Sequence, residues 1–355
     1  MGLFFFREER CKLTGDFANY PLDSEKLSSS LHEVIDCMSR TFWLVSENGR
    51  KTTNLTPEDR EEFREDAIEI TMYYVGEGEA IVISRGNRAI LVDGGEGTGT
   101  NRNDDLGRVL AARLTPGSLR AIVASHPHRD HTNFHHVLAT EYTDRFAAGA
   151  RYFDNATPAA DANWQRLQQW QPNLPFAREA VTDQPARDDE DRIQGLGAGI
   201  DAHLIRGTTG ATSTESQKYW SVFLFLQYRS AWMLFTGDAY RGYENRLRPR
   251  LEAISRRTHM LKVTHHGSSS GTSAQLVASL RPAISIASTD EDPSHRLEDD
   301  VRDRLSTTAI YATYDPNRPQ HPEKDIIART DGWIWEENGF EGVLFEVSTR
   351  EPVLL

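Results

Sequence analysis

The amino-acid sequence predicts an α/β protein built as a four-layer sandwich, in which two sheets pack face to face between outer helices. Two strand-rich stretches support this prediction: short strands begin near Glu69, and strand signals return after residue 200. Helical segments lie between and after these stretches. The 355 residues are 38% hydrophobic and 26% charged, which is typical of a chain that buries a sizeable core.

The N-terminal part, residues 1–65, differs from the rest and is predicted to be a partly helical extension, whereas residues 66–355 would form the main domain. A helix is expected over Ser28–Val45, where apolar residues recur at helical spacing. Thr56-Pro57 is typical of a helix start. The apolar run Leu3–Phe6 is too short for a secretory signal and is followed by charged residues.

The main domain alternates strands and helices. In its first half, strands are expected at 70–75, 80–84, 89–92 and 121–124, with helices at 105–114 and 130–142. In its second half, strands are expected at 200–205, 222–228, 232–235, 260–264, 283–287 and 310–313, followed by a hairpin at a sheet edge over 331–347. Residues 155–199 carry no clear pattern and could cover a cleft.

The net charge of −13, from 40 basic and 53 acidic residues, makes the chain a poor non-specific binder of nucleic acid or anionic membrane. This charge disfavours a nucleic-acid substrate without excluding one. No apolar stretch approaches the roughly 20 residues needed to cross a bilayer. Two cysteines, Cys11 and Cys37, make no disulfide framework, so we expect a cytoplasmic protein that does not associate with membranes.

The strongest motif follows the apolar strand at residues 121–124 and reads Ser125-His126-Pro127-His128-Arg129-Asp130-His131. Three imidazoles and a carboxylate within six residues suit Zn²⁺ or a similar ion. A lone histidine is more often structural, but four ligand-type residues at the mouth of a strand predict a metal site. Ligands two residues apart can face one ion, while Asp130 and His131 turn towards another.

Two later segments fit the same site. Leu234–Asp238 is an apolar strand that ends in a Gly-Asp turn, and Leu261–Ser268 is a strand that delivers His265 and His266 into a glycine turn. Each pattern alone is weak, because Gly-Asp commonly makes a turn and paired histidines often lie on a surface. Because they follow the first cluster in this order, the two segments together are a specific signal for the same metal site.

At these residues the sequence resembles the metallo-β-lactamase superfamily, in which a His-x-His-x-Asp-His motif is followed by a strand-end Asp and a final His. Within it, the chain is most similar to the soluble hydrolase domain of ComEC-like competence proteins. That closer similarity rests on Tyr74–Ala80, the Leu91–Gly95 turn and Leu261–Ser268. The resemblance covers about residues 68–348 and is specific for the fold, but not for the substrate, because the fold hosts many activities.

The resemblance implies a centre that holds one or two ions of Zn²⁺ or Mn²⁺ per chain. His126 and His128 would bind one ion, Asp130, His131 and His265 the other, and Asp238 would bridge them. Asp93 would hold the ligand loops in place, or else only form a turn. Most dinuclear members carry a further histidine where this chain reads Ser216–Ser221, without one. His203, the nearest candidate, is typical of an ordinary strand residue, and His135 and His136 are expected to pack or lie on the surface.

The implied chemistry is hydrolysis by a metal-activated water. Asp130 would orient that water and take its proton, and His266 would act at the developing oxyanion. Substrate contacts are expected from Lys262, Ser268 and His295, although His266 and Ser268 could instead cap the helix near Ser273. The sequence shows neither a phosphate-binding P-loop nor a Ser-His-Asp arrangement.

Three functions remain open. The first is a phosphodiesterase or nuclease acting on a phosphorylated small molecule or on nucleic acid, which the ComEC-like resemblance favours. The second is a carboxyl-ester, lactone or amide hydrolase of the same fold. The third is a non-catalytic module, in which the N-terminal extension engages a partner protein or a second copy of the chain. An intact ligand set argues against the third.

Overall fold

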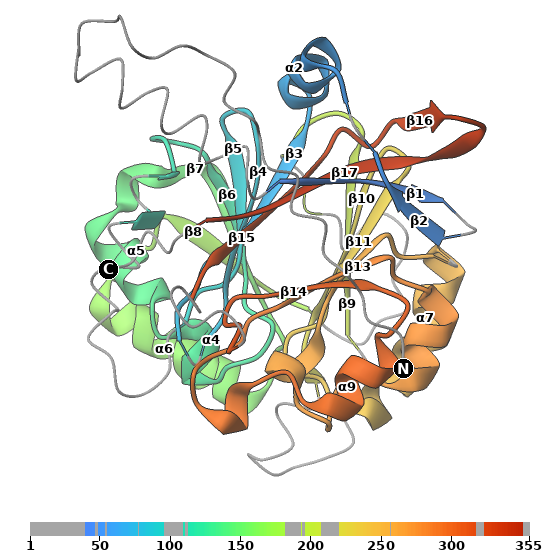
Figure 1. The fold of residues 1–355 in the computed structure, drawn as a ribbon. Helices are drawn as coiled ribbons and strands as arrows, with labels where there is room; N and C mark the ends of the chain where they lie inside the picture. Colours follow the sequence, from blue (N-terminus) through green and yellow to red (C-terminus); the bar gives the residue numbers. More distant parts are fainter. Residues whose placement is uncertain are drawn as a thin grey trace, which may run out of the picture.

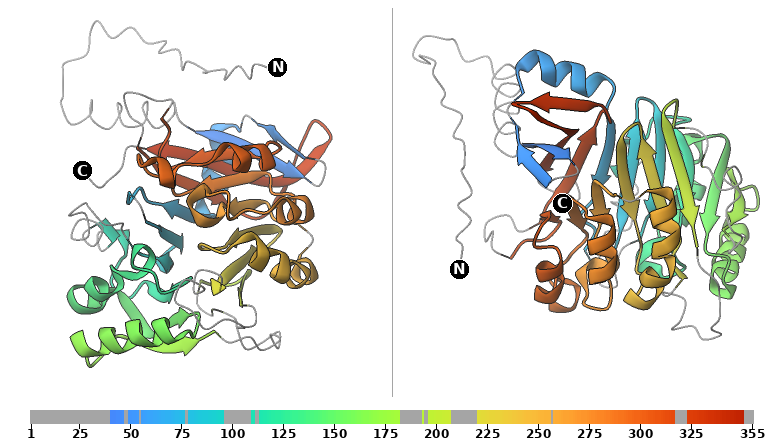
Figure 2. Two further views of the ribbon diagram at one scale, coloured as in Figure 1. Left: turned by 90° about the horizontal axis from the view of Figure 1, so that it is seen from below. Right: turned by 90° about the vertical axis from the view of Figure 1, so that its right-hand side faces the viewer.

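The computed structural model describes residues 40–46, 49–53, 55–76, 78–95, 109–110, 113–181, 193, 196–206, 220–255, 257–316 and 323–350. Two sheets pack face to face, and helices cover their outer sides (Figures 1 and 2). This is the predicted four-layer α/β sandwich. None of the described helices combines the length and apolar character needed to span a membrane.

The larger sheet contains strands from both ends of the described chain. Its strands, in spatial order, are β2 (Gly49–Thr52), β1 (Thr41–Ser46), β17 (Phe340–Arg350), β15 (Asp325–Thr330), β3 (Ile68–Met72), β4 (Ala80–Arg85), β5 (Arg88–Asp93), β6 (Leu119–Val123), β7 (Phe146–Asp154) and β8 (Phe176–Ala180), and β16 (Ile334–Glu337) pairs with β17. The run from β5 to β8 is parallel, and the other neighbours are antiparallel.

The smaller sheet carries the second half of the domain. Its spatial order is β14 (Ala309–Ala312), β13 (Ile284–Ala287), β12 (Met260–Lys262), β11 (Ala231–Phe235), β10 (Phe223–Tyr228) and β9 (Ile200–Ile205). Strands β11 to β14 are parallel, so their carboxyl ends meet at one edge of the sheet. Open α/β sheets place ligands at such an edge.

The helices form the two outer layers (Figure 1). The larger sheet is covered by α4 (Arg129–Thr132), α5 (His135–Glu141), the short 3-10 helix η2 (Thr143–Arg145) and α6 (Pro158–Trp170). The smaller sheet is covered by α7 (Arg241–Ile254), η4 (Thr264–Gly267), α8 (Ala274–Leu280), η5 (Pro293–His295) and α9 (Asp299–Arg304). A further helix, α2 (Pro57–Glu65), lies beside β1 and β17.

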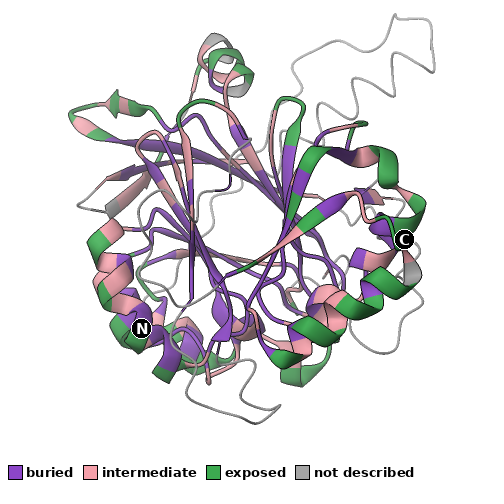
Figure 3. Ribbon diagram, turned by 180° about the vertical axis from the view of Figure 1, so that it is seen from behind, coloured by how far each residue is buried: buried purple, intermediate pink, exposed green. Residues whose placement is uncertain are grey.

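Alternating side chains build separate cores on the two faces of each sheet. In β5, Ile90 and Val92 join the core between the sheets, whereas Leu91 packs towards the helices with Leu138. A third core lies between the smaller sheet and α7 to α9. Buried residues accordingly fill the sheets, and exposed residues gather on the outer sides of the helices (Figure 3).

The N-terminal segment differs from its prediction. Thr41–Ser46 is a strand that pairs with β17, whereas the sequence predicted a helix that continued to Val45. Its alternating burial places Phe42 and Leu44 under α2, and a strand satisfies that pattern better than a helix. The larger sheet therefore includes residues 41–52 from the segment predicted as an extension, and residues 1–39 lie outside the described part.

Other expectations are confirmed with adjusted limits. The predicted helix 130–142 is divided into α4 and α5, and β3 begins and ends earlier than predicted. The hairpin at 331–347 is present, with a two-residue Asn338-Gly339 turn in which both residues have positive φ. Its strand β16 pairs with β17 alone and so lies at an edge, as predicted, whereas β17 also pairs with β1 and β15. The predicted helix 105–114 lies mostly outside the described residues.

Candidate metal centre

The ligand-type residues converge from both sheets at the carboxyl ends of their strands. The loop after β6 carries His126 and His128 and leads into α4, which contains Asp130 and His131. In the smaller sheet, Asp238 follows β11, and the loop after β12 carries His265 and His266. The two halves of the fold therefore each supply part of one cluster.

Asp238 lies at the middle of this cluster. Its Oδ2 atom is 3.4 Å from His131 Nε2, 3.7 Å from His265 Nε2 and 4.0 Å from His126 Nε2. Its other oxygen, Oδ1, is 3.4 Å from His266 Nε2. Both carboxylate oxygens of Asp238 therefore face imidazole nitrogens.

Asp130 lies on the open side of the same cluster. Its Oδ2 atom is 3.4 Å from His131 Nε2 and 3.9 Å from His266 Nε2. The side chain of Asp130 is 26% exposed, compared with 1% for Asp238. The ring of His128 lies 4.6 Å from that of His126, measured between centroids. All the residues predicted as metal ligands are therefore brought to one place.

The arrangement fits a divalent cation. Within the described residues, Nε2 of His126, His131 and His266 and both oxygens of Asp238 are buried and make no hydrogen bond. Leaving such atoms without a partner is costly, so their convergence is typical of a site that binds a metal ion. Single donor atoms of Asp130, His131, Asp238 and His266 lie within 4.8 Å of one another. Imidazole and carboxylate donors suit Zn²⁺ or Mn²⁺.

The electrostatics favour a cation at the same point. Burial alone would lower the pKa of the His131 imidazole, but the charges of Asp238 and Asp93 outweigh it and raise that pKa well above its usual value. Burial would raise the pKa of Asp238, yet His266 and His131 hold it well below its usual range. The potential of the carboxylates, which here favours a proton on an imidazole, equally favours a metal ion.

Asp93, at the end of β5, holds the first ligand loop in place. Its carboxylate accepts hydrogen bonds from Ser125 N at 2.7 Å, from Ser125 Oγ at 2.8 Å and from His131 Nδ1 at 2.8 Å. The bond from Nδ1 leaves His131 Nε2 for the centre. Asp93 is buried and has a φ of 56°, a backbone conformation that costs free energy in a non-glycine residue. It therefore does more than form a turn.

Lys262 differs from its prediction as a substrate-binding residue. Its side chain is 0% exposed, and its ammonium forms an ion pair with Glu79 and donates to Gly237 O at 3.0 Å. Glu79 in turn is bonded through its backbone to Asp130 O at 3.1 Å. Lys262 therefore lies beneath the centre, where it links the Asp238 turn to the larger sheet. The Leu261–Ser268 motif did not reveal this burial.

The loop that carries His265 and His266 is strained and firmly held. Both histidines have a φ of 53°, so other contacts must fix the backbone. The buried carboxylate of Glu244 on α7 accepts hydrogen bonds from Thr272 N at 2.8 Å and Ser273 N at 2.6 Å. Sequence reasoning missed Glu244, although it lies on the buried stripe of α7 with Leu247 and Leu251. A carboxylate on an apolar stripe was the available signal.

The remaining predicted residues lie around the centre. His295 lies 6.1 Å from His266 between ring centroids, and Ser268 Oγ lies 3.0 Å from Ser270 Oγ. Ser268 and His266 do not cap α8, because Ser273 performs that role through its contact with Leu276 N. His266 instead lies inside the cluster.

The other histidines take structural positions. His135 Nδ1 lies 3.1 Å from the Tyr152 hydroxyl, and His136 Nδ1 lies 2.6 Å from Asn133 O, which agrees with the prediction that both pack away from the centre. His203 is a strand residue of β9, opposite Phe225. Residues 207–219, where the sequence lacks the further histidine, lie outside the described part.

Comparisons with known proteins give a family match for the chain. The family model described as "Metallo-beta-lactamase superfamily" matches residues 73–290. No curated protein matches the chain. No comparison identifies the ComEC-like relation, which stays a prediction.

Solved structures with a similar fold include the metallo-beta-lactamase fold protein YhfI from Bacillus subtilis, the short form of human tRNase Z and zinc-bound PqqB from Methylobacterium extorquens. Sequence identities to them are 13%, 13% and 9%, and TM-scores are 0.45, 0.42 and 0.41. The matches cover 68%, 63% and 66% of this chain and 96%, 93% and 84% of the respective structures.

Proposed function

The chain belongs to the metallo-β-lactamase superfamily, and from this premise we propose that it is a metal-dependent hydrolase that cleaves phosphodiesters. The observation that carries the proposal is the buried cluster around Asp238, whose two oxygens face imidazoles on different sides. A carboxylate so placed suits two cations that share it. Two bound ions would generate a nucleophile from water at neutral pH and clamp the attacking and leaving oxygens of an in-line displacement.

The side chains around the metal centre would have different roles in this hydrolysis. Asp238, which is 1% exposed, forms the floor of the centre. Asp130 lies at the open side of the centre. Burial would raise the pKa of the Asp130 carboxyl, but the charge of His131 outweighs burial and lowers that pKa, so the carboxyl is ionised at neutral pH. It can hold the attacking water and accept its proton. His295, beside His266, lies where an incoming substrate would pass.

Charge sets the size of the preferred substrate. The chain carries a net charge of −13, which disfavours long polyanions more than small ones. Lys262 gives no support to substrate binding, because it is buried against Glu79. We therefore favour a small phosphodiester, or a short nucleotide chain, over a long nucleic acid. The predicted resemblance to ComEC-like domains points to the same bond.

A substrate panel tests the proposal. The purified protein is assayed with Mn²⁺ and with Zn²⁺ against bis-p-nitrophenyl phosphate, DNA, RNA, cyclic nucleotides, a lactone and a β-lactam. We expect turnover of the phosphodiesters that is lost in His128→Ala and retained in His136→Ala, a matched change outside the cluster. Turnover of only the lactone or the β-lactam, lost in His128→Ala, would instead assign a carboxyl-ester, lactone or amide hydrolase.

A further inference from the structure

The edge of the smaller sheet that carries the metal centre continues beyond it. The parallel strands β11, β12, β13 and β14 end side by side, and their carboxyl ends lead in order to Asp238, His266, the loop containing His295, and Tyr314. Neighbouring strands lie about 4.8 Å apart, so the end of β14 is roughly 10 Å from the end of β12. A ligand lying along this edge can reach both.

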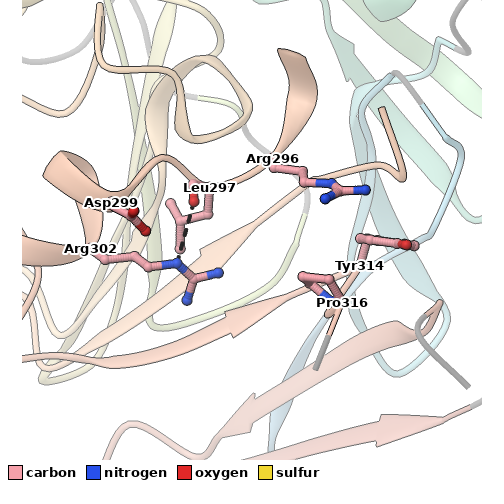
Figure 4. Close-up of a pocket in the computed structure, with 6 residues that line it drawn as sticks. All are labelled: Arg296, Leu297, Asp299, Arg302, Tyr314 and Pro316. Carbon is pink, nitrogen blue, oxygen red and sulfur yellow. Dashed lines mark hydrogen bonds between the residues drawn. The ribbon is translucent and has the colours of Figure 1, made fainter. Parts of the chain in front are cut away.

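A pocket of about 390 Å³ lies at this second position. It is lined by Arg296, Leu297, Asp299, Arg302, Tyr314 and Pro316 (Figure 4). Its volume is within the range of small-molecule sites, which begins at about 300 Å³. The pocket is therefore large enough for a phosphate and part of the group that carries it.

Two guanidinium groups are fixed around this pocket by backbone carbonyls. Arg296 donates from Nε and Nη2 to Glu291 O at 3.0 and 2.5 Å, and its guanidinium lies 5.5 Å from the centre of the Tyr314 ring. Arg302 donates from Nε to Leu297 O at 3.3 Å. Within the described residues neither arginine forms a salt bridge, although the exposed carboxylate of Asp299 also lines the pocket. Figure 4 shows Arg296 and Arg302 at different sides of the pocket.

A single chain segment separates the pocket from the metal centre. His295 faces His266 on one side, and the next residue, Arg296, contributes to the pocket. Leu297 packs against Gly267 so closely that a Cβ on that glycine would approach it to 2.7 Å. The same segment is bonded from Glu298 N to Gly267 O at 3.0 Å. The segment from His295 to Glu298 therefore borders both the pocket and the metal centre.

We propose that Arg296 and Arg302 bind a second phosphate of the substrate, so that the substrate class is a phosphodiester that carries a further phosphate. A nucleotide phosphorylated at its other end, or a short oligonucleotide, has this chemistry. Guanidinium groups match phosphate in charge and in the geometry of their donors. The inference rests on the proposed function, because the phosphodiester at the metal centre sets the position of the second phosphate.

A pair of substrates that differ only in the second phosphate gives the kinetic test. The 5′-p-nitrophenyl phosphodiester of thymidine is compared with the same compound bearing a 3′-phosphate. We expect the phosphorylated compound to be preferred about tenfold in kcat/KM, since one charge-assisted contact has about this effect. Arg302→Gln should remove the preference, whereas Arg246→Gln, an exposed arginine on α7, should retain it. An equal preference in the wild-type protein and Arg302→Gln would overturn the assignment.

A binding measurement separates this inference from the proposed function. Calorimetry of the metal-loaded, full-length protein compares thymidine 5′-monophosphate with thymidine 3′,5′-bisphosphate, neither of which contains a phosphodiester. Tighter binding of the bisphosphate, lost in Arg302→Gln, would support the pocket even if the protein cleaved no phosphodiester. Equal affinities for the two nucleotides, in a protein that does cleave phosphodiesters, would reject the pocket and leave the function standing.

Discussion

Glu79 and Lys262 form a buried ion pair beneath the metal centre. Both side chains are 0% exposed, and they approach from different sheets. Burial raises the pKa of Glu79, and the charge of Lys262 opposes this effect. Burying two charges costs several kcal/mol per ion, and an ion pair offsets this only with good geometry. The pair is therefore better understood as a device that fixes the Asp130 and Gly237 loops than as a source of net stability.

Removing one partner should be much worse than removing both. Glu79→Gln and Lys262→Met should each cost about 3–5 kcal/mol, because each leaves an uncompensated buried group. The double variant should cost less than the sum of the two, and the difference measures the coupling. Urea unfolding of the three variants and the wild-type protein in EDTA provides the measurement. Additive costs would mean that the two groups do not interact.

The sequence predicted which residues gather at the centre better than what each contacts. The His126–His131 motif and Asp238 were found because ligand-type residues recur at strand ends, a pattern that is local in sequence. The burial of Lys262 and the role of Glu244 depend on segments far apart in the chain, so no local pattern reveals them. The inward position of His266 depends on a φ of 53°, which a His-His-Gly sequence permits but does not specify.

His259, the residue immediately before β12, should make stability depend on pH. Its Nδ1 accepts a hydrogen bond from Trp232 N at 3.0 Å, and burial, with the nearby charge of Arg257, lowers its pKa to about 3. In the unfolded chain the histidine pKa is about 6.5, so between this pH and about 3 the unfolded state binds a proton that the folded state does not bind. The neutral ring therefore contributes stability above pH 6.5 that is lost as pH falls towards 3.

The variant His259→Asn keeps an acceptor for Trp232 N but cannot take a proton. Between about pH 6.5 and 4, the wild-type protein should lose up to about 1.4 kcal/mol more per pH unit than the variant. Urea unfolding in EDTA at several pH values measures the two slopes, with no contribution from metal binding. Parallel slopes would show that His259 is not a neutral buried group.

Among the elements, β1 was the least predictable from the sequence. The strands that were predicted in the main domain follow from alternating or continuous apolar runs, whereas Thr41–Ser46 lies in a stretch where helical spacing also occurs. Its strand form depends on β17, almost 300 residues later in the chain, which offers the hydrogen-bonding partner. The sequence boundary at residue 65 falls between α2 and β3, and the sheet continues on both sides of it.

Truncation should distinguish the two parts of the N-terminal segment. Removal of residues 1–65 deletes β1, β2 and α2, which exposes the edge of β17 and the apolar contacts of Phe42, Leu44 and Phe63. Each such side chain contributes about 2 kcal/mol by burial, and an open edge invites aggregation. The bond from Trp43 Nε1 to the Tyr311 hydroxyl, at 2.8 Å, would also be lost.

We therefore expect the protein lacking residues 1–65 to be insoluble or unfolded. The protein lacking residues 1–39 keeps all of β1 and should unfold at a temperature close to that of the full chain. Circular dichroism and size-exclusion chromatography of the two truncated proteins make the comparison. A folded, monomeric protein that begins at Asp66 would show that β1 and α2 are accessory.

Across the whole molecule, the metal centre is the place where the two halves meet. His126 and Asp130 come from the larger sheet, whereas Asp238 and His266 come from the smaller one, so a bound ion would tie both sheets together. The core between the sheets already joins the halves through apolar contacts. A bound ion would add a directional link at one edge, and it would reduce the repulsion between the carboxylates of Asp130 and Asp238.

Metal binding should therefore stabilise the entire fold and not only the loops. An ion at about 100 times its dissociation constant adds about 2.7 kcal/mol. For a domain of this size, we expect an increase of roughly 5 °C in the temperature of unfolding. Adding EDTA should reverse the increase in a single transition, since both halves supply ligands. Asp238→Asn should abolish the increase.

Variants at His265 and His266 test which of the two imidazoles contributes more to metal binding. His266 Nε2 is buried and has no hydrogen bond among the described residues, whereas His265 Nδ1 lies 2.7 Å from Ser270 Oγ at a more open position. We expect His266→Ala to lose more of the zinc-induced stabilisation than His265→Ala, with His136→Ala unchanged. Thermal unfolding with and without Zn²⁺ measures all three. A larger loss in His265→Ala would instead support the ligand assignment implied by the sequence resemblance. An increase that persists in Asp238→Asn would show that the ion binds elsewhere.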